Sequence, residues 1–189
     1  MRKLKIIEHI SLDGVIQVSG EDGDFPYGDW TAPYRTPAGR EAMLAAHGAS
    51  FDLLLGRRPY DDWSGYWPKA PSSPMADGLN AATKFVATRR PESLDWGPFE
   101  GLGPDIAEGV RRIKSQDGPG LILSGSSTLI SMLLEHGLAD EVVLASIRCC
   151  WARANASLPT APRPVHSGLS APKPCRPASS STLTRSPGL

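Results

Sequence analysis

The sequence predicts an α/β protein in which a mostly parallel sheet is flanked by helices. Two observations predict this class. Strand-like and helix-like segments alternate along residues 1–147, and several strand-like segments are short apolar runs of the kind found in buried strands. A third observation limits the domain, because the composition changes abruptly near residue 147. We therefore expect one domain at 1–147 and a separate tail at 148–189.

In the first part of the domain, apolar residues predict strands at 4–10 and 51–56. The helix between them is expected to begin after Thr36, an N-cap residue followed directly by proline, and to end at Gly48. Residues 19–37 contain several glycines and prolines and are predicted to form a long loop.

The rest of the domain continues the alternation. Residues 105–114 carry apolar side chains at helical spacing. Residues 91–104 are rich in proline and glycine, and we expect a loop there with a short strand near Trp96. The other predicted helices lie at 60–65, 75–82 and 128–136, and the other predicted strands lie at 84–88, 121–123 and 141–147.

The tail differs in kind from the domain. Residues 148–189 contain six of the 20 basic residues, none of the 20 acidic ones, seven of the 18 prolines and all 3 cysteines. Such a segment cannot bury enough apolar area to offset the entropy of ordering it, so we expect irregular coil apart from a short strand around 148–152. Either a reading-frame change in a GC-rich gene, which we favour, or a genuine linker or interaction segment explains this composition.

Composition also excludes several classes of function. No apolar run approaches the ~18 residues of a membrane span, and the N-terminus lacks the features of a signal peptide, so a cytoplasmic protein is expected. The acidic domain argues against a nucleic-acid partner. The domain has no cysteine, and its histidines lack the spacing of a zinc site, so no metal is expected. The sequence has no GxxxxGK, GxGxxG or GxSxG motif.

Three predicted strands end in residues that suit a phosphate-bearing ligand. Backbone N–H groups at a helix N-terminus attract anions, glycine lets the backbone approach, and ligands of α/β sheets bind beyond the carboxyl ends of the strands. Three such ends suit a dinucleotide. These corners are Gly56-Arg57-Arg58, Thr88-Arg89 and Ser124-Gly125-Ser126-Ser127.

Each corner also has an ordinary structural explanation. Gly56 serves equally as a turn residue, strands often end in threonine and arginine, and Ser124 to Ser127 form an N-cap whether or not a ligand binds. Asp13 is the carboxylate best placed to face a ligand, and the alternative is an Asp-Gly turn former. The three corners together indicate a ligand site more strongly than any one of them.

Several short motifs occur in an order that is similar to one known family. They are Ser-Leu-Asp-Gly at 11–14, Leu-Leu-Gly-Arg-Arg-Pro-Tyr at 54–60, Tyr-Trp-Pro at 66–68, Lys-Phe-Val-Ala-Thr-Arg at 84–89, Ser-Gly-Ser-Ser at 124–127 and the stretch 133–141. Together they resemble the dihydrofolate-reductase-like superfamily over about residues 3–147. The resemblance is to the C-terminal reductase domain of bacterial bifunctional riboflavin-biosynthesis deaminase–reductases and its stand-alone relatives.

The resemblance implies an NADPH-dependent reductase with a three-layer fold, often a homodimer. Its implied catalytic residue is Asp13, beside the nicotinamide. Its implied cofactor-binding residues are Gly56, Arg57 and Arg58 at the phosphates, Thr88 and Arg89 at the 2′-phosphate, and Ser124, Gly125, Ser126 and Ser127 at the pyrophosphate. Its implied substrate residues are Asp13, Gly14, Tyr60 and Trp67.

The sequence also departs from the family. Pro59 usually is threonine in dihydrofolate reductases proper, Ser124 replaces the first glycine of a pair, and no match to the folate-binding carboxylate is found, all of which argues against folate as substrate. After 147 the family's usual proline, Leu-Gly-x-Gly turn and two terminal strands are absent, so we expect these strands to be missing.

The predicted function is NADPH-dependent hydride transfer to a small heterocyclic or carbonyl substrate, of the kind represented by 5-amino-6-(5-phosphoribosylamino)uracil. The alternative is a non-catalytic nucleotide-binding or remnant protein, inactivated by loss of the terminal strands. The expected partners are a small-molecule substrate and a second copy of the chain, with neither nucleic acid nor membrane.

Overall fold

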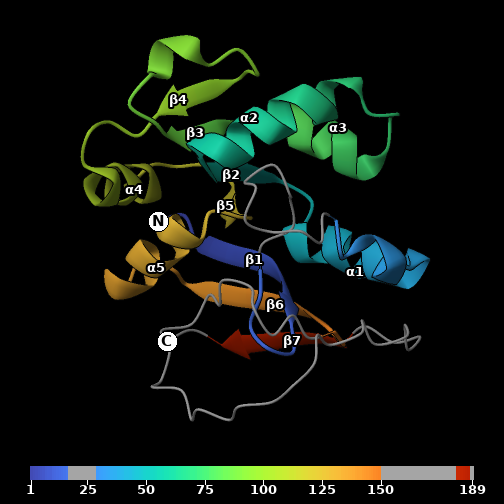
Figure 1. The fold of residues 1–189 in the computed structure, drawn as a ribbon. Coiled ribbons are helices and arrows are strands. Elements are labelled where there is room, and N and C mark those ends of the chain that lie inside the picture. Colours follow the sequence, from blue (N-terminus) through green and yellow to red (C-terminus); the bar gives the residue numbers. More distant parts are fainter. Residues whose placement is uncertain (17–28, 150–181, 188–189) are drawn as a thin grey trace, which may run out of the picture.

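The centre of the protein is a seven-stranded sheet (Figure 1). It is seen in a computed structural model that describes residues 1–16, 29–149 and 182–187. The strand order is β4-β3-β2-β5-β1-β6-β7, and all neighbours are parallel except β6 and β7. The strands are β1 (Leu4–Ser11), β2 (Phe51–Gly56), β3 (Lys84–Ala87), β4 (Phe99–Gly101), β5 (Gly120–Leu123), β6 (Glu141–Ile147) and β7 (Thr182–Pro187). The predicted α/β class with a mostly parallel, mixed sheet is confirmed.

Helices cover both faces of the sheet, which gives three layers (Figure 1). One face packs against the first three helices and the other against the last two, because buried side chains form a separate core cluster on each side. The helices are α1 (Pro37–His47), α2 (Arg57–Tyr66), α3 (Pro74–Ala81), α4 (Ile106–Ser115) and α5 (Ser127–Glu135). Short 3₁₀ turns lie at η1 (Ala32–Tyr34), η2 (Trp67–Lys69) and η3 (Pro91–Ser93). No helix among the described residues has the length and apolar character needed to cross a bilayer.

Strand β2 shows why short apolar runs predict a buried sheet. Every residue of this strand is buried, and side chains alternate between the two faces. Leu53 and Leu55 enter the core beneath α1, α2 and α3, whereas Leu54 enters the core beneath α4 and α5. A strand with helices on both sides therefore has no polar face.

Three helices begin with a side-chain cap. The Thr36 side chain accepts a hydrogen bond from Gly39 N (3.0 Å), as predicted, and Gly48 ends α1 with a φ of +82°. Ser73 caps α3 and Asp105 caps α4 in the same way, at 3.2 and 3.0 Å. These caps satisfy N–H groups that have no partner within the helix.

Two details differ from the expectations. The strand expected near Trp96 is β4, three residues later, because Trp96 itself is buried and its indole Nε1 donates to Asn80 Oδ1 (2.9 Å). β6 ends at Ile147, and Arg148 and Cys149, the described part of the strand expected around 148–152, lie outside it. Its chain turns inward instead, since Cys149 is buried and its carbonyl accepts a hydrogen bond from Leu12 N (2.9 Å).

Strand β7 lies in the segment that composition predicts to be irregular. Its register pairs Val142 with Ser186 and Leu144 with Thr184 along the outer edge of β6. An edge strand presents unpaired N–H and C=O groups, and the Thr-Leu-Thr run that pairs with it has high β propensity. The expectation of irregular coil is thus wrong for these six residues. The rest of the tail from 150, and residues 17–28 of the predicted long loop, lie outside the described residues.

Candidate functional site

The strand order brings the three predicted corners to neighbouring positions at one edge of the sheet. Gly56 pairs with Ala87 on β3, and Leu54 pairs with Leu123 on β5. Because these strands are parallel, the residues that follow them leave the sheet at the same edge, its carboxyl edge. The corners at Gly56–Arg58, Thr88–Arg89 and Ser124–Ser127 therefore lie side by side.

Two of the corners touch. A Cβ atom added to Gly56 would lie 2.7 Å from Ser126 Oγ and 2.9 Å from Ser126 Cβ, so only glycine fits there without movement of the other corner. Gly125 has a φ of +78°, and a Cβ atom on it would lie 3.4 Å from Cγ of Pro59. The glycines thus permit a close approach of the β2–α2 and β5–α5 corners.

The helices that start at these two corners lack side-chain caps. Neither Gly56 before α2 nor Ser126 before α5 provides a side-chain hydrogen bond to its helix, whereas α1, α3 and α4 are all capped. Ser126 has a φ of +71°, a left-handed conformation that is uncommon outside glycine. Helix N-termini without a side-chain cap favour an anion at this edge.

Glu8 is a buried carboxylate at the same edge, and it was not among the predicted site residues. It is 7% exposed, and its Oε1 accepts a hydrogen bond from Gly125 N. Burial raises the pKa of Glu8 to about 7, and the Gly125 N–H opposes that rise. Its sequence signal is a glutamate that interrupts the apolar run of a buried strand. That signal is weak because it occurs equally in a strand with one solvated face.

The basic side chains of the corners are more exposed. The Arg57 guanidinium donates to Asp61 Oδ2 (2.9 Å) and to Ser93 Oγ (2.6 Å), which holds it between α2 and η3. Thr88 Oγ1 accepts a hydrogen bond from Arg90 N (3.0 Å), and Arg58 and Arg89 are exposed. Cationic groups thus border the edge, although Arg57 is already paired with a carboxylate.

Two predicted substrate residues, Tyr60 and Trp67, lie in α2 and directly after it. Tyr60 is 1% exposed, and its hydroxyl accepts hydrogen bonds from Asp95 N (2.9 Å) and Trp96 N (2.6 Å), so it belongs to the core. Trp67 follows the last residue of α2, about 15 Å from its start at the helical rise of 1.5 Å per residue, and its carbonyl accepts from Asn80 Nδ2 (3.0 Å). Substrate contact by Tyr60 and Trp67 therefore stays a prediction.

Asp13 and Gly14 form the turn that follows β1. Ser11 Oγ donates to Asp13 Oδ1 (2.6 Å), Gly14 N donates to the Ser11 carbonyl (3.1 Å), and Gly14 has a φ of +84°. The Asp-Gly turn is thus present as predicted. Because β1 lies next to β5, this turn leaves the same edge of the sheet as Ser124, whose Oγ donates to the Ile7 carbonyl (3.0 Å). A contact between Asp13 and substrate stays a prediction.

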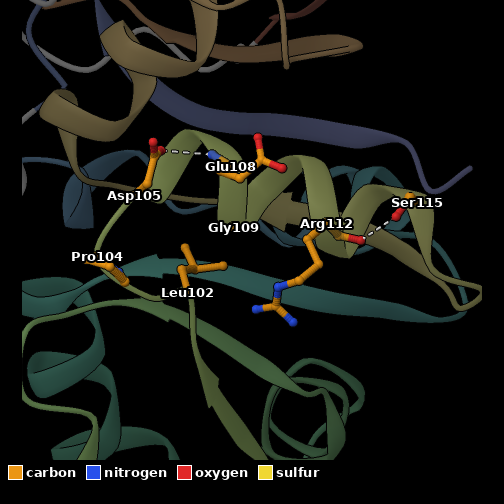
Figure 2. A pocket seen from close by; sticks show the side chains of 7 residues that line it. All are labelled: Leu102, Pro104, Asp105, Glu108, Gly109, Arg112 and Ser115. Carbon is orange, nitrogen blue, oxygen red and sulfur yellow. Dashed lines mark hydrogen bonds between the residues drawn. The ribbon is translucent and has the colours of Figure 1, made fainter.

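A groove of about 440 Å³ lies elsewhere, along α4 (Figure 2). Its polar groups have partners within the protein, since Asp105 caps α4 and the Arg112 guanidinium donates to Glu100 Oε1 (2.7 Å). None of the predicted site residues lines it. Its lining residues are Leu102, Pro104, Asp105, Glu108, Gly109, Arg112 and Ser115. Within the described part of the chain, no group of three or more His, Cys, Asp or Glu side chains is arranged to hold a metal ion.

Comparison with known sequences gives a partial relative of the chain. No family model matches the chain. The chain is 28% identical over 97 residues to "Uncharacterized protein YyaP" of Bacillus subtilis (strain 168), which is 49% of this chain and 51% of that protein. The chain therefore spans about half the length of this curated relative in the match.

Solved structures resemble a larger part of the chain than this sequence relative does. Dihydrofolate reductase from Enterococcus faecalis, complexed with NADP(H) and RAB-propyl, has a TM-score of 0.53 at 16% identity and covers 84% of this chain and 77% of its own. A "Putative riboflavin biosynthesis protein" from Shewanella sp. PV-4 has a TM-score of 0.55 at 16% identity, covering 89% of this chain and 87% of its own. The chain therefore has the dihydrofolate-reductase-like fold. The fold expected from the resemblance of the sequence motifs is thus confirmed.

Proposed function

We propose that the protein is an NADPH-dependent reductase that transfers a hydride to a small heterocyclic or carbonyl substrate. The observation that carries this proposal is the contact between two helix N-termini without side-chain caps, at Gly56 and Ser126 on the carboxyl edge. Two adjacent helix N-termini without side-chain caps suit the two phosphates of a dinucleotide. The solved dihydrofolate reductase with this fold was complexed with NADP(H), which supports the same cofactor class.

The residues at the edge fit such a cofactor. Glycine at 56 and 125 leaves space that a Cβ atom would fill, so a diphosphate can approach the backbone. Thr88 and Arg89 follow β3, the strand beside β2, and would bind the 2′-phosphate that distinguishes NADPH from NADH. The cofactor supplies the hydride, and the chain supplies orientation and charge.

Substrate is expected beside the turn at Asp13, one strand further along the edge. Asp13 is exposed and accepts a hydrogen bond from Ser11, so its carboxylate is held in an exposed position at the carboxyl edge. Tyr60 lies in the protein interior, and Trp67 lies at the far end of α2. Of the four substrate residues named from the motifs, we therefore assign substrate contact to Asp13 and Gly14.

Titration of the protein with NADPH and NADH, followed by nicotinamide fluorescence, tests the cofactor assignment. We expect Arg89→Ala to weaken NADPH binding about tenfold, because a charge-assisted hydrogen bond contributes about 1.5–3 kcal/mol, and to leave NADH affinity nearly unchanged. Arg111→Ala, which removes an exposed guanidinium on α4, is the matched control and should affect neither cofactor. Equal losses of both cofactors in Arg89→Ala would contradict the assignment.

A further inference from the structure

The anion position at the start of α5 is already occupied by a side chain of the protein. Glu8 Oε1 accepts the N–H of Gly125, two residues before the first residue of α5, and Glu8 is more than nine-tenths buried. Within the described residues the structure gives the second carboxyl oxygen of Glu8 no hydrogen bond. A buried carboxyl group that is only half satisfied therefore faces the backbone that a phosphate would need.

No charged side chain in the described segments accounts for the state of Glu8. The influences on its pKa are burial and the Gly125 N–H. β5 has no titratable residue, and the ionisable residue of α5, Glu135, lies at the far end of that helix. On β6, Glu141 lies at the start of the strand, 3.7 Å from Lys5 Nζ.

His9 and Arg57 are two further ionisable groups near this edge, and both have other charged neighbours. His9 is the next residue along β1, so its side chain leaves the opposite face of the sheet. Burial lowers the pKa of His9, and Arg35 lowers it further while Asp29 raises it. On α2, Arg57 is paired with Asp61 at 2.8 Å. The protonation of Glu8 thus reports on its own burial and on whatever binds at Gly125.

We propose that Glu8 is a resident anion at the start of α5 that a ligand diphosphate replaces, so that dinucleotide binding is coupled to proton uptake by Glu8. The proposal rests on the proposed function, because the ligand class is the same. It makes Glu8 a positioning residue: it holds the Gly125 turn ready in the empty protein and gives up that N–H to the ligand.

Two physical effects couple the proton to the ligand. An ionised Glu8 repels the diphosphate and competes strongly with it for the Gly125 N–H. A protonated Glu8 carries no charge, accepts that N–H more weakly and can donate its own hydrogen to a phosphate oxygen. Since burial raises the pKa of Glu8 to about 7, both forms are populated near neutral pH. Binding should therefore weaken as the pH rises above 7, with a limiting slope of one proton.

The test compares the protein with Glu8→Gln, using ADP-ribose as the probe because its diphosphate does not titrate near neutral pH. We expect the Kd of the unaltered protein to rise about tenfold between pH 6 and pH 8, and that of Glu8→Gln to change less than twofold. Calorimetry at pH 8 in two buffers of different ionisation enthalpy should show uptake of nearly one proton in the unaltered protein and none in Glu8→Gln. Glu135→Gln, at the exposed end of α5, is the matched control and should retain the full pH dependence.

A second measurement needs no ligand. In the isotope-labelled protein, the Glu8 carboxyl carbon and the Gly125 amide should titrate together near pH 7. Titration of Glu8 at its ordinary value, or a Kd in the unaltered protein that is as independent of pH as in Glu8→Gln, overturns the inference. Binding of ADP-ribose with the expected pH dependence, but no binding of NADPH, would overturn the proposed function and support the role of Glu8.

Discussion

Buried charged groups at the two edges of the sheet differ in how many partners they have within the protein. At the amino edge, where the strands begin, the buried side chains of Arg2, Lys84 and Lys114 each have at least two partners within the protein. At the carboxyl edge, a buried carboxyl group has one, and two helix N-termini have no side-chain cap. The difference separates the part of the protein that maintains the fold from the part that is available to a ligand.

At the amino edge, the Arg2 guanidinium forms an ion pair with Asp52 and donates to the Pro119 carbonyl (2.7 Å). Asp52 also accepts a hydrogen bond from Thr83 N (2.9 Å). A second pair follows the same pattern, since Lys114 Nζ donates to Asp140 Oδ2 (2.5 Å) and to the Leu138 carbonyl (2.6 Å). Buried ions persist only with such complete sets of partners.

Lys84 is the most enclosed charge at this edge. It is fully buried, its Nζ donates to the Asn80 carbonyl (2.7 Å), and it lies 4.3 Å from the centre of the Trp96 ring. Burial lowers the pKa of Lys84 to about 8, although the nearby Asp52 opposes that shift. A cation so enclosed has no access to a ligand and serves the fold.

The largest effect should come from breaking the amino edge. Asp52→Ala would leave the Arg2 guanidinium buried without its carboxylate, which costs about 3–5 kcal/mol of unfolding free energy. Arg112→Ala breaks an exposed pair with Glu100 and should cost less than about 1 kcal/mol. Urea denaturation of both variants measures the difference. Equal losses would show that burial does not distinguish the two ion pairs.

Glu8, at the carboxyl edge, should make the free energy of unfolding depend on pH. Between pH 4.5 and about 7 the unfolded chain ionises Glu8 while the folded protein keeps it protonated, so stability falls as the pH rises through this window and levels off above it. The loss is about 3 kcal/mol for a shift of this size. Denaturation of the unaltered protein and of Glu8→Gln at pH 5 and pH 8 isolates this contribution, because other groups titrate in both proteins. Parallel pH profiles would contradict it.

The contact between the two corners should show up as a steric effect. Gly56→Ala would place a Cβ atom 2.7 Å from Ser126 Oγ, and overpacking of this kind costs about 1–3 kcal/mol. Combining it with Ser126→Gly removes the clash and should restore much of the stability. Gly65→Ala, also on α2 but with open space around it, should instead stabilise by about 0.5–1 kcal/mol. Thermal denaturation of the unaltered protein, Gly56→Ala, the Gly56→Ala/Ser126→Gly double variant and Gly65→Ala distinguishes a clash from a general effect of alanine.

The smallest effect concerns the helix caps. Thr36→Ala removes the cap of α1 and should cost about 1 kcal/mol. Ser126→Ala removes no cap, because the Ser126 side chain makes no hydrogen bond to α5, and should cost much less. Chemical denaturation of Thr36→Ala and Ser126→Ala measures the two losses in unfolding free energy. A loss in Ser126→Ala as large as in Thr36→Ala would mean that α5 depends on its N-cap side chain after all.

Local signals in the sequence were sufficient for most of the fold. The Thr36-Pro37 start and Gly48 end of α1, and the apolar run of β2, each report a property of one segment, and each is found where expected. Trp96 misled the strand prediction because its burial comes from a contact with Asn80, sixteen residues away. Such partners are set by tertiary packing rather than by neighbouring residues.

The candidate site divides in the same way. The three corners follow from strand ends and small residues, which are local, and the strand order then placed them together. The sequence around Tyr60, four residues after Gly56, gives no sign that its hydroxyl turns inward to Asp95 and Trp96. Glu8 was missed because its significance comes from Gly125, 117 residues away.

The position of β1 has a consequence for how the chain acquires this site during synthesis. β2, β3 and β4 are contiguous in sequence and in the sheet, so they can associate once residue 101 has been made. β1 is made first but pairs only with β5 and β6, which end at residues 123 and 147. The first strand must therefore wait with both edges unpaired until almost the whole domain has left the ribosome, at roughly 5–20 residues per second. Glu8 and Gly125 meet when β5 joins β1, so a ligand that binds at Gly125 would report a late step of folding rather than its beginning.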